Sequence, residues 1–280
     1  MIKRKWNNLL IQFFSYLLLT ILIIFSLFPA AWMILTSFKP MNEIYKSPPK
    51  IIIQNPTFLN YTRVLFKSNI PRAFLNSVVV AFFTILLNLV ISILAAYGLT
   101  RYKFKGSETI SIGMLFGQML PAVVIVIPLY MIYNKLRLID TYSALIIANL
   151  TVTVPMSVLM LKSFFLTIPR ELEEAAKIDG CSNFGTIFRI IIPLAVPGII
   201  AVTIYSFLHA WDEFLYALNF INSASIKTLP IAITEFKGQF VMDWGGMMSA
   251  SVIISIPLMV LFLLCSKYFI KGLSEGAIKG

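Results

Sequence analysis

The sequence predicts an all-α membrane protein with six transmembrane helices and a further short helix in the loop between the fourth and the fifth. Of its 280 residues, 59% are hydrophobic and only 12% are charged. A soluble domain of this size does not need so much apolar surface. Each uncharged run also exceeds the roughly 20 residues that a helix needs to cross the hydrocarbon layer. These runs lie at 6–38, 73–100, 109–134, 141–161, 190–211 and 244–266.

The six spans are expected within one transmembrane domain that covers residues 1–280. The first follows the basic segment "MIKRKW" and continues to Phe38, which is too long for the apolar region of a signal peptide. Prolines inside the spans are expected to kink them, because each removes a hydrogen bond from the helix. The predicted bounds, to within several residues, are 11–36, 74–99, 110–133, 142–162, 188–218 and 246–269.

Both chain ends are predicted to lie in the cytoplasm. An even number of spans places the ends on one side, and the basic flanks "KRK" at 3–5 and "RYKFK" at 101–105 mark that side as cytoplasmic. The net charge of +11 comes from loop residues that are not clustered with aromatic ones, which argues against nucleic-acid binding. We therefore expect a multi-pass protein of the cell membrane, in contact with the lipid bilayer.

Residues that support catalysis or metal binding are sparse. Cys181 and Cys265 have no disulfide or metal-site spacing, and His209 is the single histidine. His209 is expected to be a hydrogen-bonded packing residue, with a proton relay as the alternative. There is no phosphate-binding P-loop. We expect no catalytic residue, no metal site and no cofactor bound by this chain.

The loop at 163–187 contains the acidic segment "EEAAKIDG", residues 173–180. Pro169 suits a first helical position, and the glutamates that follow oppose the positive pole of a helix dipole. Glu173 and Lys177 have the spacing of a favourable i, i+4 ion pair. Gly180 stands where a left-handed residue commonly ends a helix.

The predicted acidic helix has only a narrow apolar stripe, formed by Leu172, Ala175, Ala176 and Ile178. A helix of about three turns is not stable alone in water, so it has to dock onto another surface. That surface is either the membrane with the protein's own helix ends, or a partner protein.

The same loop resembles the "EAA" loop of ABC-transporter permease subunits. Glu174-Ala175-Ala176 is followed after three residues by Gly180 and after nine more by "IIIP" at 190–193. The family pattern is E-A-A-x3-G-x9-I-x-L-P, and the chain departs from it only at Ile192, where leucine is usual.

Segments throughout the chain resemble the sugar-permease branch of that family, in particular the shorter permease of the maltose and multiple-sugar type. The departures are Asp212, where asparagine is common, and "LSEGA" near the end of the chain. The similar segments are "WMILTSFKP" (32–40), "AFLNSVVV" (73–80), "RYKFKG" (101–106), "IIIPLAVPGI" (190–199), "WDEFLYAL" (211–218), "TLPIAI" (228–233) and "YFIKGLSEGAIKG" (268–280).

The resemblance implies a permease subunit of an ATP-driven sugar importer that forms half of the solute pathway. The acidic helix would then be a cytoplasmic coupling helix. Its implied partners are a second permease subunit in a heterodimer, cytoplasmic ATP-binding subunits that hold ATP and Mg²⁺, an extracytoplasmic solute-binding protein and a carbohydrate solute. The residues implied in contact with the ATPase are Glu174, Ala175, Ala176, Asp179 and Gly180.

Polar residues in the spans are candidates for the solute pathway, above all Asn88, Asn149 and Tyr205. Hydrogen bonding between helices is the alternative role for them. The sequence assigns no transport role to Asp212 or His209 and indicates no particular sugar.

Three other functions are alternatives to the sugar importer. An ABC importer for a non-carbohydrate solute remains the main alternative. A secondary carrier is disfavoured, because the chain has no internal repeat and its span centres carry no charged residue. A membrane-embedded enzyme would need a nucleophile with its base or a metal cluster, and one histidine with two distant cysteines does not provide either.

Overall fold

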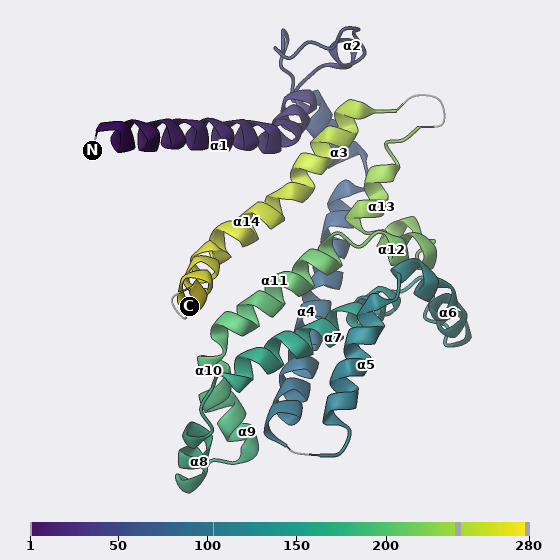
Figure 1. Ribbon diagram of the computed structural model, residues 1–280. Helices are drawn as coiled ribbons and strands as arrows, with labels where there is room; N and C mark the ends of the chain where they lie inside the picture. Colours follow the sequence, from purple (N-terminus) through teal and green to yellow (C-terminus); the bar gives the residue numbers. More distant parts are fainter. Residues whose placement is uncertain (1, 103, 239–241, 278–280) are drawn as a thin grey trace. The chain divides into compact units, whose positions relative to one another are not determined.

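A computed structural model of the protein describes residues 2–102, 104–238 and 242–277, which form helices joined by loops (Figure 1). The chain divides into two compact units. Unit 1 comprises Met1–Ser68 and Ile233–Ser255, and unit 2 comprises Asn69–Ala232 and Ile256–Gly280. The all-helical fold class is confirmed for the described residues.

The helices follow one another with short connections. They are α1 (Ile2–Ser37), α2 (Met41–Ile44), α3 (Leu59–Lys67), α4 (Ile70–Arg101), α5 (Ser107–Met119), α6 (Ala122–Lys135), α7 (Tyr142–Leu166), α8 (Glu171–Ile178), α9 (Asn183–Thr186), the π-helix η1 (Ile187–Ile191), α10 (Ile192–Leu194), α11 (Val196–Trp211), α12 (Leu215–Phe220), the 3₁₀-helix η2 (Ala224–Ile226), α13 (Leu229–Thr234) and α14 (Trp244–Ala277).

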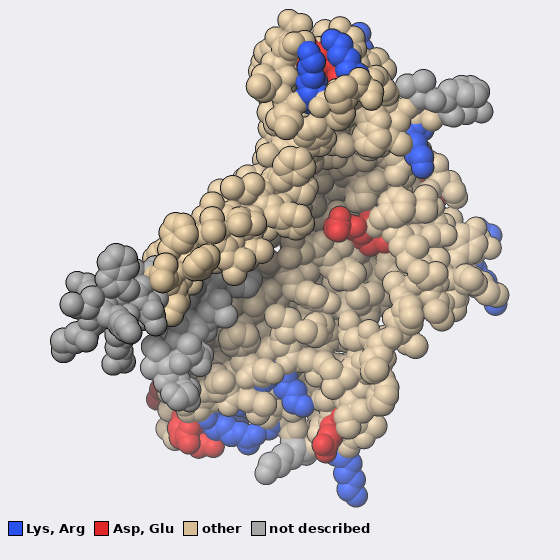
Figure 2. Space-filling model, turned by 45° about the horizontal axis from the view of Figure 1, so that its top comes forward, with Lys and Arg blue, Asp and Glu red and all other residues tan. Residues whose placement is uncertain are grey.

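Four helical segments are long and apolar enough to cross a membrane by themselves: Leu10–Ser37, Ile70–Arg101, Tyr142–Leu166 and Trp244–Cys265. Two more apolar stretches are bent helix pairs. Ser107–Met119 and Ala122–Lys135 meet at 102°, and Asn183–Leu194 meets Val196–Trp211 at 82°. Every predicted span overlaps one of these six stretches. Charged side chains gather in small clusters between wide uncharged areas of the surface (Figure 2).

Proline chemistry accounts for both bends. Leu120 stands before Pro121 and has an extended backbone with ψ of 128°, as steric repulsion from a following proline ring favours. At the second bend Ala195 leaves the helical region, with φ of −90° and ψ of 8°, between Pro193 and Pro197. Both prolines lack the N–H that would continue the helical hydrogen bonds, so the helix breaks between them.

The core of unit 2 lies between α4, α7 and α11. One apolar cluster joins α7 to α12 and includes Leu145, Tyr216 and Phe220. The other cluster includes Tyr97 of α4 and Phe165 of α7. This second cluster extends to Ile168 and η1, on either side of the acidic helix α8 in the chain.

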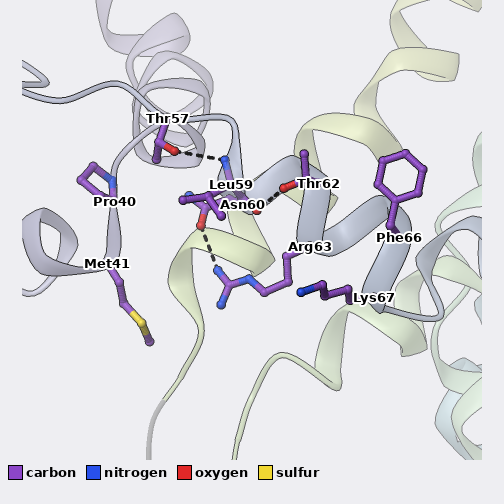
Figure 3. A pocket seen from close by; sticks show the side chains of 9 residues that line it. All are labelled: Pro40, Met41, Thr57, Leu59, Asn60, Thr62, Arg63, Phe66 and Lys67. Carbon is purple, nitrogen blue, oxygen red and sulfur yellow. Dashed lines mark hydrogen bonds between the residues drawn. The ribbon is translucent and has the colours of Figure 1, made fainter.

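Unit 1 is organised around Asn60 of α3. Its amide nitrogen donates to the carbonyl oxygens of Ser37 and Lys39, both at 2.9 Å. Arg63, one turn later, donates to Asn60 at 2.9 Å and forms an ion pair with Asp243 at 3.0 Å. A cavity of about 420 Å³ opens beside α3 (Figure 3). Its lining residues are Pro40, Met41, Thr57, Leu59, Asn60, Thr62, Arg63, Phe66 and Lys67.

Asp140 connects the loop between α6 and α7 to the loop after α12 through hydrogen bonds. Its carboxylate accepts hydrogen bonds from the backbone N–H groups of Asn222 and Ser223, each at 2.9 Å, and from the Ser223 hydroxyl. These bonds favour the ionised form and lower the pKa of the Asp140 carboxyl.

The Asp140 contacts predict a pH dependence of stability. Because the folded-state pKa is depressed, the contribution is present above the unfolded pKa and is lost as pH falls through the folded pKa. We expect Asp140→Asn to lower the thermal midpoint of the detergent-purified protein at neutral pH and to have little effect in acid. Asp212→Asn, a change at an exposed carboxylate, is the control. An equal loss at both pH values for Asp140→Asn would contradict the account.

Candidate coupling helix and solute pathway

The acidic helix exists and is shorter than the sequence suggested. It spans Glu171–Ile178, and Arg170 is its N-cap, so the prediction that Pro169 occupies the first helical position is wrong. All three glutamates lie in the first turn, where no side-chain cap bonds the free N–H groups. Their charges compensate the positive pole of the helix there.

A left-handed glycine closes the helix, as predicted. Gly180 has φ of +82°, and its N–H donates to the Lys177 carbonyl at 3.0 Å. The next N–H, that of Cys181, donates to the Ala176 carbonyl at 2.9 Å. This pair of bonds is the Schellman motif, which satisfies carbonyl groups that a helix end would otherwise leave free.

The predicted contact residues do not share one face. Glu174, Ala175, Asp179 and Gly180 are exposed, whereas Ala176 is only 6% exposed. Two large apolar side chains, Leu172 and Ile178, accompany the exposed group, and Ile178 is 87% exposed.

Glu173 points inward, which corrects the predicted pair with Lys177. Its carboxylate forms an ion pair with Arg101 at the end of α4, and Tyr97 donates to its other oxygen at 3.0 Å. The side chains of Glu173 and Arg101 are 6% and 8% exposed. Sequence spacing did not reveal this contact, because the two residues are far apart in the chain.

Asn88 lies at the junction of α4, α7 and α11. Its amide donates to the hydroxyls of Ser157 at 2.8 Å and Ser206 at 2.5 Å, and Ser92 donates to its carbonyl oxygen at 3.1 Å. The residue is fully buried. These contacts are those of a residue that joins helices, the alternative role that its residue type suggested.

Asn149 and Tyr205, the other pathway candidates, differ in exposure. Asn149 is 1% exposed and donates to the Leu145 carbonyl of its own helix. Tyr205 is partly exposed and lines an open cavity of about 510 Å³ in unit 2. The other lining residues are Ala122, Leu208, His209, Asp212, Glu213, Phe214, Leu215 and Tyr216.

The cavity brings together aromatic rings, an imidazole and two carboxylates. Glu213 was not singled out from the sequence, although it directly follows Asp212. Its carboxylate accepts from the N–H groups of Tyr216 at 2.5 Å and Ala217 at 2.9 Å, which caps α12. His209 and Asp212 both line this cavity. The ring of Tyr205 lies edge-on to the imidazole of His209, with the two ring centroids 6.0 Å apart.

The Asn88 contacts yield a test of its role. We expect Asn88→Leu to destabilise the purified protein by roughly 1–3 kcal/mol, since the hydroxyls of Ser157 and Ser206 lose their donor. Ser92→Ala removes one bond and should cost less. If Asn88→Leu kept the wild-type thermal midpoint and only reduced solute uptake, Asn88 would belong to the pathway instead.

Comparison with known proteins places the chain among transport proteins. The family described as "Binding-protein-dependent transport system inner membrane component" matches residues 88–275. The chain is 35% identical to the probable ABC transporter permease protein YurM of Bacillus subtilis, over 99% of this chain and 91% of that protein. It is 38% identical to the trehalose/maltose transport system permease protein MalG of Thermococcus litoralis, over 92% and 93% of the two chains.

The fold also matches solved structures. A chain of a bacterial ABC transporter involved in the import of the acidic polysaccharide alginate superimposes with a TM-score of 0.84. The match covers 94% of this chain and 98% of that one at 18% identity. A second structure contains the alginate transporter in complex with an alginate pentasaccharide-bound periplasmic protein, and matches with a TM-score of 0.67 at 17% identity. At these identities the likeness concerns the fold.

Proposed function

Since the chain belongs to the family of binding-protein-dependent transport system inner membrane components, we propose that it is the permease subunit of an ATP-driven sugar importer. The observation that carries the proposal is α8, an exposed acidic helix with a Schellman cap in a chain that is similar over its whole length to named permeases. The relatives named for a sugar favour a carbohydrate solute. They include the permease for trehalose and maltose, one for trehalose from Mycobacterium tuberculosis and one for diacetylchitobiose from Streptomyces coelicolor.

In this proposal residues 1–280 form one transmembrane domain with six crossings. Each bent helix pair then counts as one span, which is consistent with its apolar composition. Both chain ends lie in the cytoplasm of a cell whose membrane the protein crosses, and the loop at 163–187 faces the same side. A second permease subunit completes the solute pathway.

The helix α8 docks into a groove on a cytoplasmic ATP-binding subunit. Glu174, Ala175, Asp179 and Gly180 form the contact surface, and Glu174 faces a basic group there. Ala176 contributes from the inner face, where it packs the helix against the permease. The partner subunit holds ATP and Mg²⁺, because this chain has no P-loop of its own.

Transport follows from the movement of the docked helix. When the ATP-binding subunits close on ATP and open after hydrolysis, α8 moves with them as part of a rigid body. The spans tilt and expose the pathway to one side of the membrane and then to the other. A solute-binding protein on the outer side delivers the sugar.

The cavity beside Tyr205 is the part of the pathway that this chain supplies. Aromatic side chains such as Tyr205 and Phe214 offer flat apolar faces to a sugar ring, and Asp212 accepts hydrogen bonds from hydroxyl groups. Asn88 and Asn149 remain pathway candidates only if the transport cycle exposes them.

A non-carbohydrate solute is the alternative within the same class of transporter. Purification of the whole importer, followed by titration of sugars against the solute-binding protein that co-purifies, separates the two. Saturable binding of a mono- or oligosaccharide supports the proposal. Binding of an amino acid, peptide or ion in place of every sugar tested would refute it.

The exposed face of α8 predicts a specific loss of assembly. Ala175→Phe places a large side chain in the proposed groove and should weaken docking by about 1–3 kcal/mol. Gly180→Val should cost a similar amount, since φ of +82° disfavours a β-branched residue. We expect normal membrane levels of both variants and fewer co-purified ATP-binding subunits. Gly98→Ala in α4, where an added Cβ meets no atom within 4 Å, is the control. Wild-type retention and uptake in both variants would show that α8 is not a docking element.

The orientation is tested with reporter fusions. A reporter that functions only in the cytosol should be active when it is fused after Gly280 and inactive when it is fused after Asn222. A reporter that functions only outside the cytoplasm should give the reverse pattern. Equal behaviour of the two fusion sites would contradict the six-crossing topology.

A further inference from the structure

Polar side-chain contacts join α8 and the residues just before it to α4. Covalently, α8 follows α7 after a four-residue connection and precedes α9. The Glu173 side chain of α8 contacts α4. Glu173 pairs with Arg101, the last residue of α4, and its second carboxylate oxygen accepts from the hydroxyl of Tyr97 one turn earlier. Both carboxylate oxygens are therefore used by the same helix.

Two arginines add further hydrogen bonds between α4 and the segment that leads into α8. Arg101 of α4 donates to the carbonyl oxygen of Ile168, just before α8, at 3.1 Å. Arg170, the N-cap of α8, donates to the carbonyl oxygen of Thr100 in α4 at 3.0 Å. Each arginine thus bonds the backbone of the other's segment. The carbonyl of Thr100 is one of those that a helix end leaves free, and a cation is favoured there.

The ion pair between Arg101 and Glu173 is buried, which indicates that it has a positional role. Removing two charges from water is expensive, and a well-packed apolar pair at the same place is often as stable. The charged pair of Glu173 and Arg101 adds geometric specificity, because an arginine–carboxylate contact with further hydrogen bonds fixes the relative position of two elements. Glu173 directly precedes Glu174 and Ala175, which are exposed for docking. The exposed residues Glu174 and Ala175 therefore lie in the same helical turn as the buried Glu173, so a displacement of the exposed side of α8 also displaces Glu173.

We propose that Tyr97, Arg101 and Glu173 form a clasp through which displacement of α8 is transmitted to α4, so that α4 moves together with the docked helix. The proposal rests on the proposed docking of α8 onto an ATP-binding subunit. Glu173 is a positioning residue: it acts through α4 and does not touch solute or nucleotide. In this proposal Glu174 contacts the ATP-binding subunit, whereas its sequence neighbour Glu173 contacts the membrane helix α4.

Glu173→Gln tests the clasp in the complete importer, reconstituted in liposomes with its solute-binding protein. The amide keeps the shape of the carboxylate and leaves the Arg101 charge without its partner. We expect wild-type retention of the ATP-binding subunits and continued ATP hydrolysis, with solute uptake per ATP reduced about tenfold, which lies within the usual range of coupling between two sites. Glu171→Gln, a change in the same helical turn at an exposed glutamate, should leave all three quantities unchanged.

Tyr97→Phe is the milder companion variant, and it carries the test if Glu173→Gln does not reach the membrane. It removes the 3.0 Å hydrogen bond and keeps the ion pair, so uptake per ATP should fall less. Unchanged uptake per ATP in the variants would overturn the proposal. So would a parallel loss of ATP-binding subunits and uptake, because Glu173 would then only maintain the helix. If Ala175→Phe fails to release the ATP-binding subunits in the same assay, the docking of α8 itself is wrong, which is a separate result.

Discussion

Hydrocarbon offers a protein no hydrogen-bond partners, and this constraint governs most of the architecture of the chain. A helix satisfies its own backbone, and the six apolar stretches found among the described residues are helices or bent helix pairs. Polar side chains within these stretches have to find partners on neighbouring helices. Asn88 does so with three serines from α4, α7 and α11, and thereby fixes the three helices to one another. Burial within the protein has a similar effect on Arg101 and Glu173, because neither charge is stable there without the other.

The bent helix pairs and the acidic helix interrupt the regular packing of long helices. The breaks at Pro121 and Ala195 divide two apolar stretches into segments that meet at 102° and 82°. Between the second break and α7 lies the loop that carries α8. The helix α8 is attached to α4 by side chains and to α7 by the backbone, so the docking proposed for it would connect a partner protein to the helical core of unit 2. The cavity that contains Tyr205 belongs to the same unit.

Much of this could be predicted from the sequence, because the signals are local. Uncharged runs located the six apolar stretches, and "EEAAKIDG" located α8 with its left-handed Gly180. The predicted partner of Glu173 was wrong because a local signal was used. The i, i+4 spacing indicates Lys177, whereas the buried carboxylate pairs with Arg101 of a helix that is distant in sequence. Prolines indicated kinks but not their angles. The cap that Glu213 provides for α12 also escaped prediction, because it depends on where the preceding helix ends.

The central claim is that α8 and the C-terminal end of α4 move as one body during the proposed transport cycle. Spin labels at Leu172 of α8 and Leu94 of α4, both on exposed side chains, measure their separation directly. Cys181 and Cys265 would first be replaced by serine so that only the introduced sites are labelled. The account predicts the same mean distance in the nucleotide-free and ATP-bound importer. A shift that approaches one helical turn, about 5 Å, would contradict it.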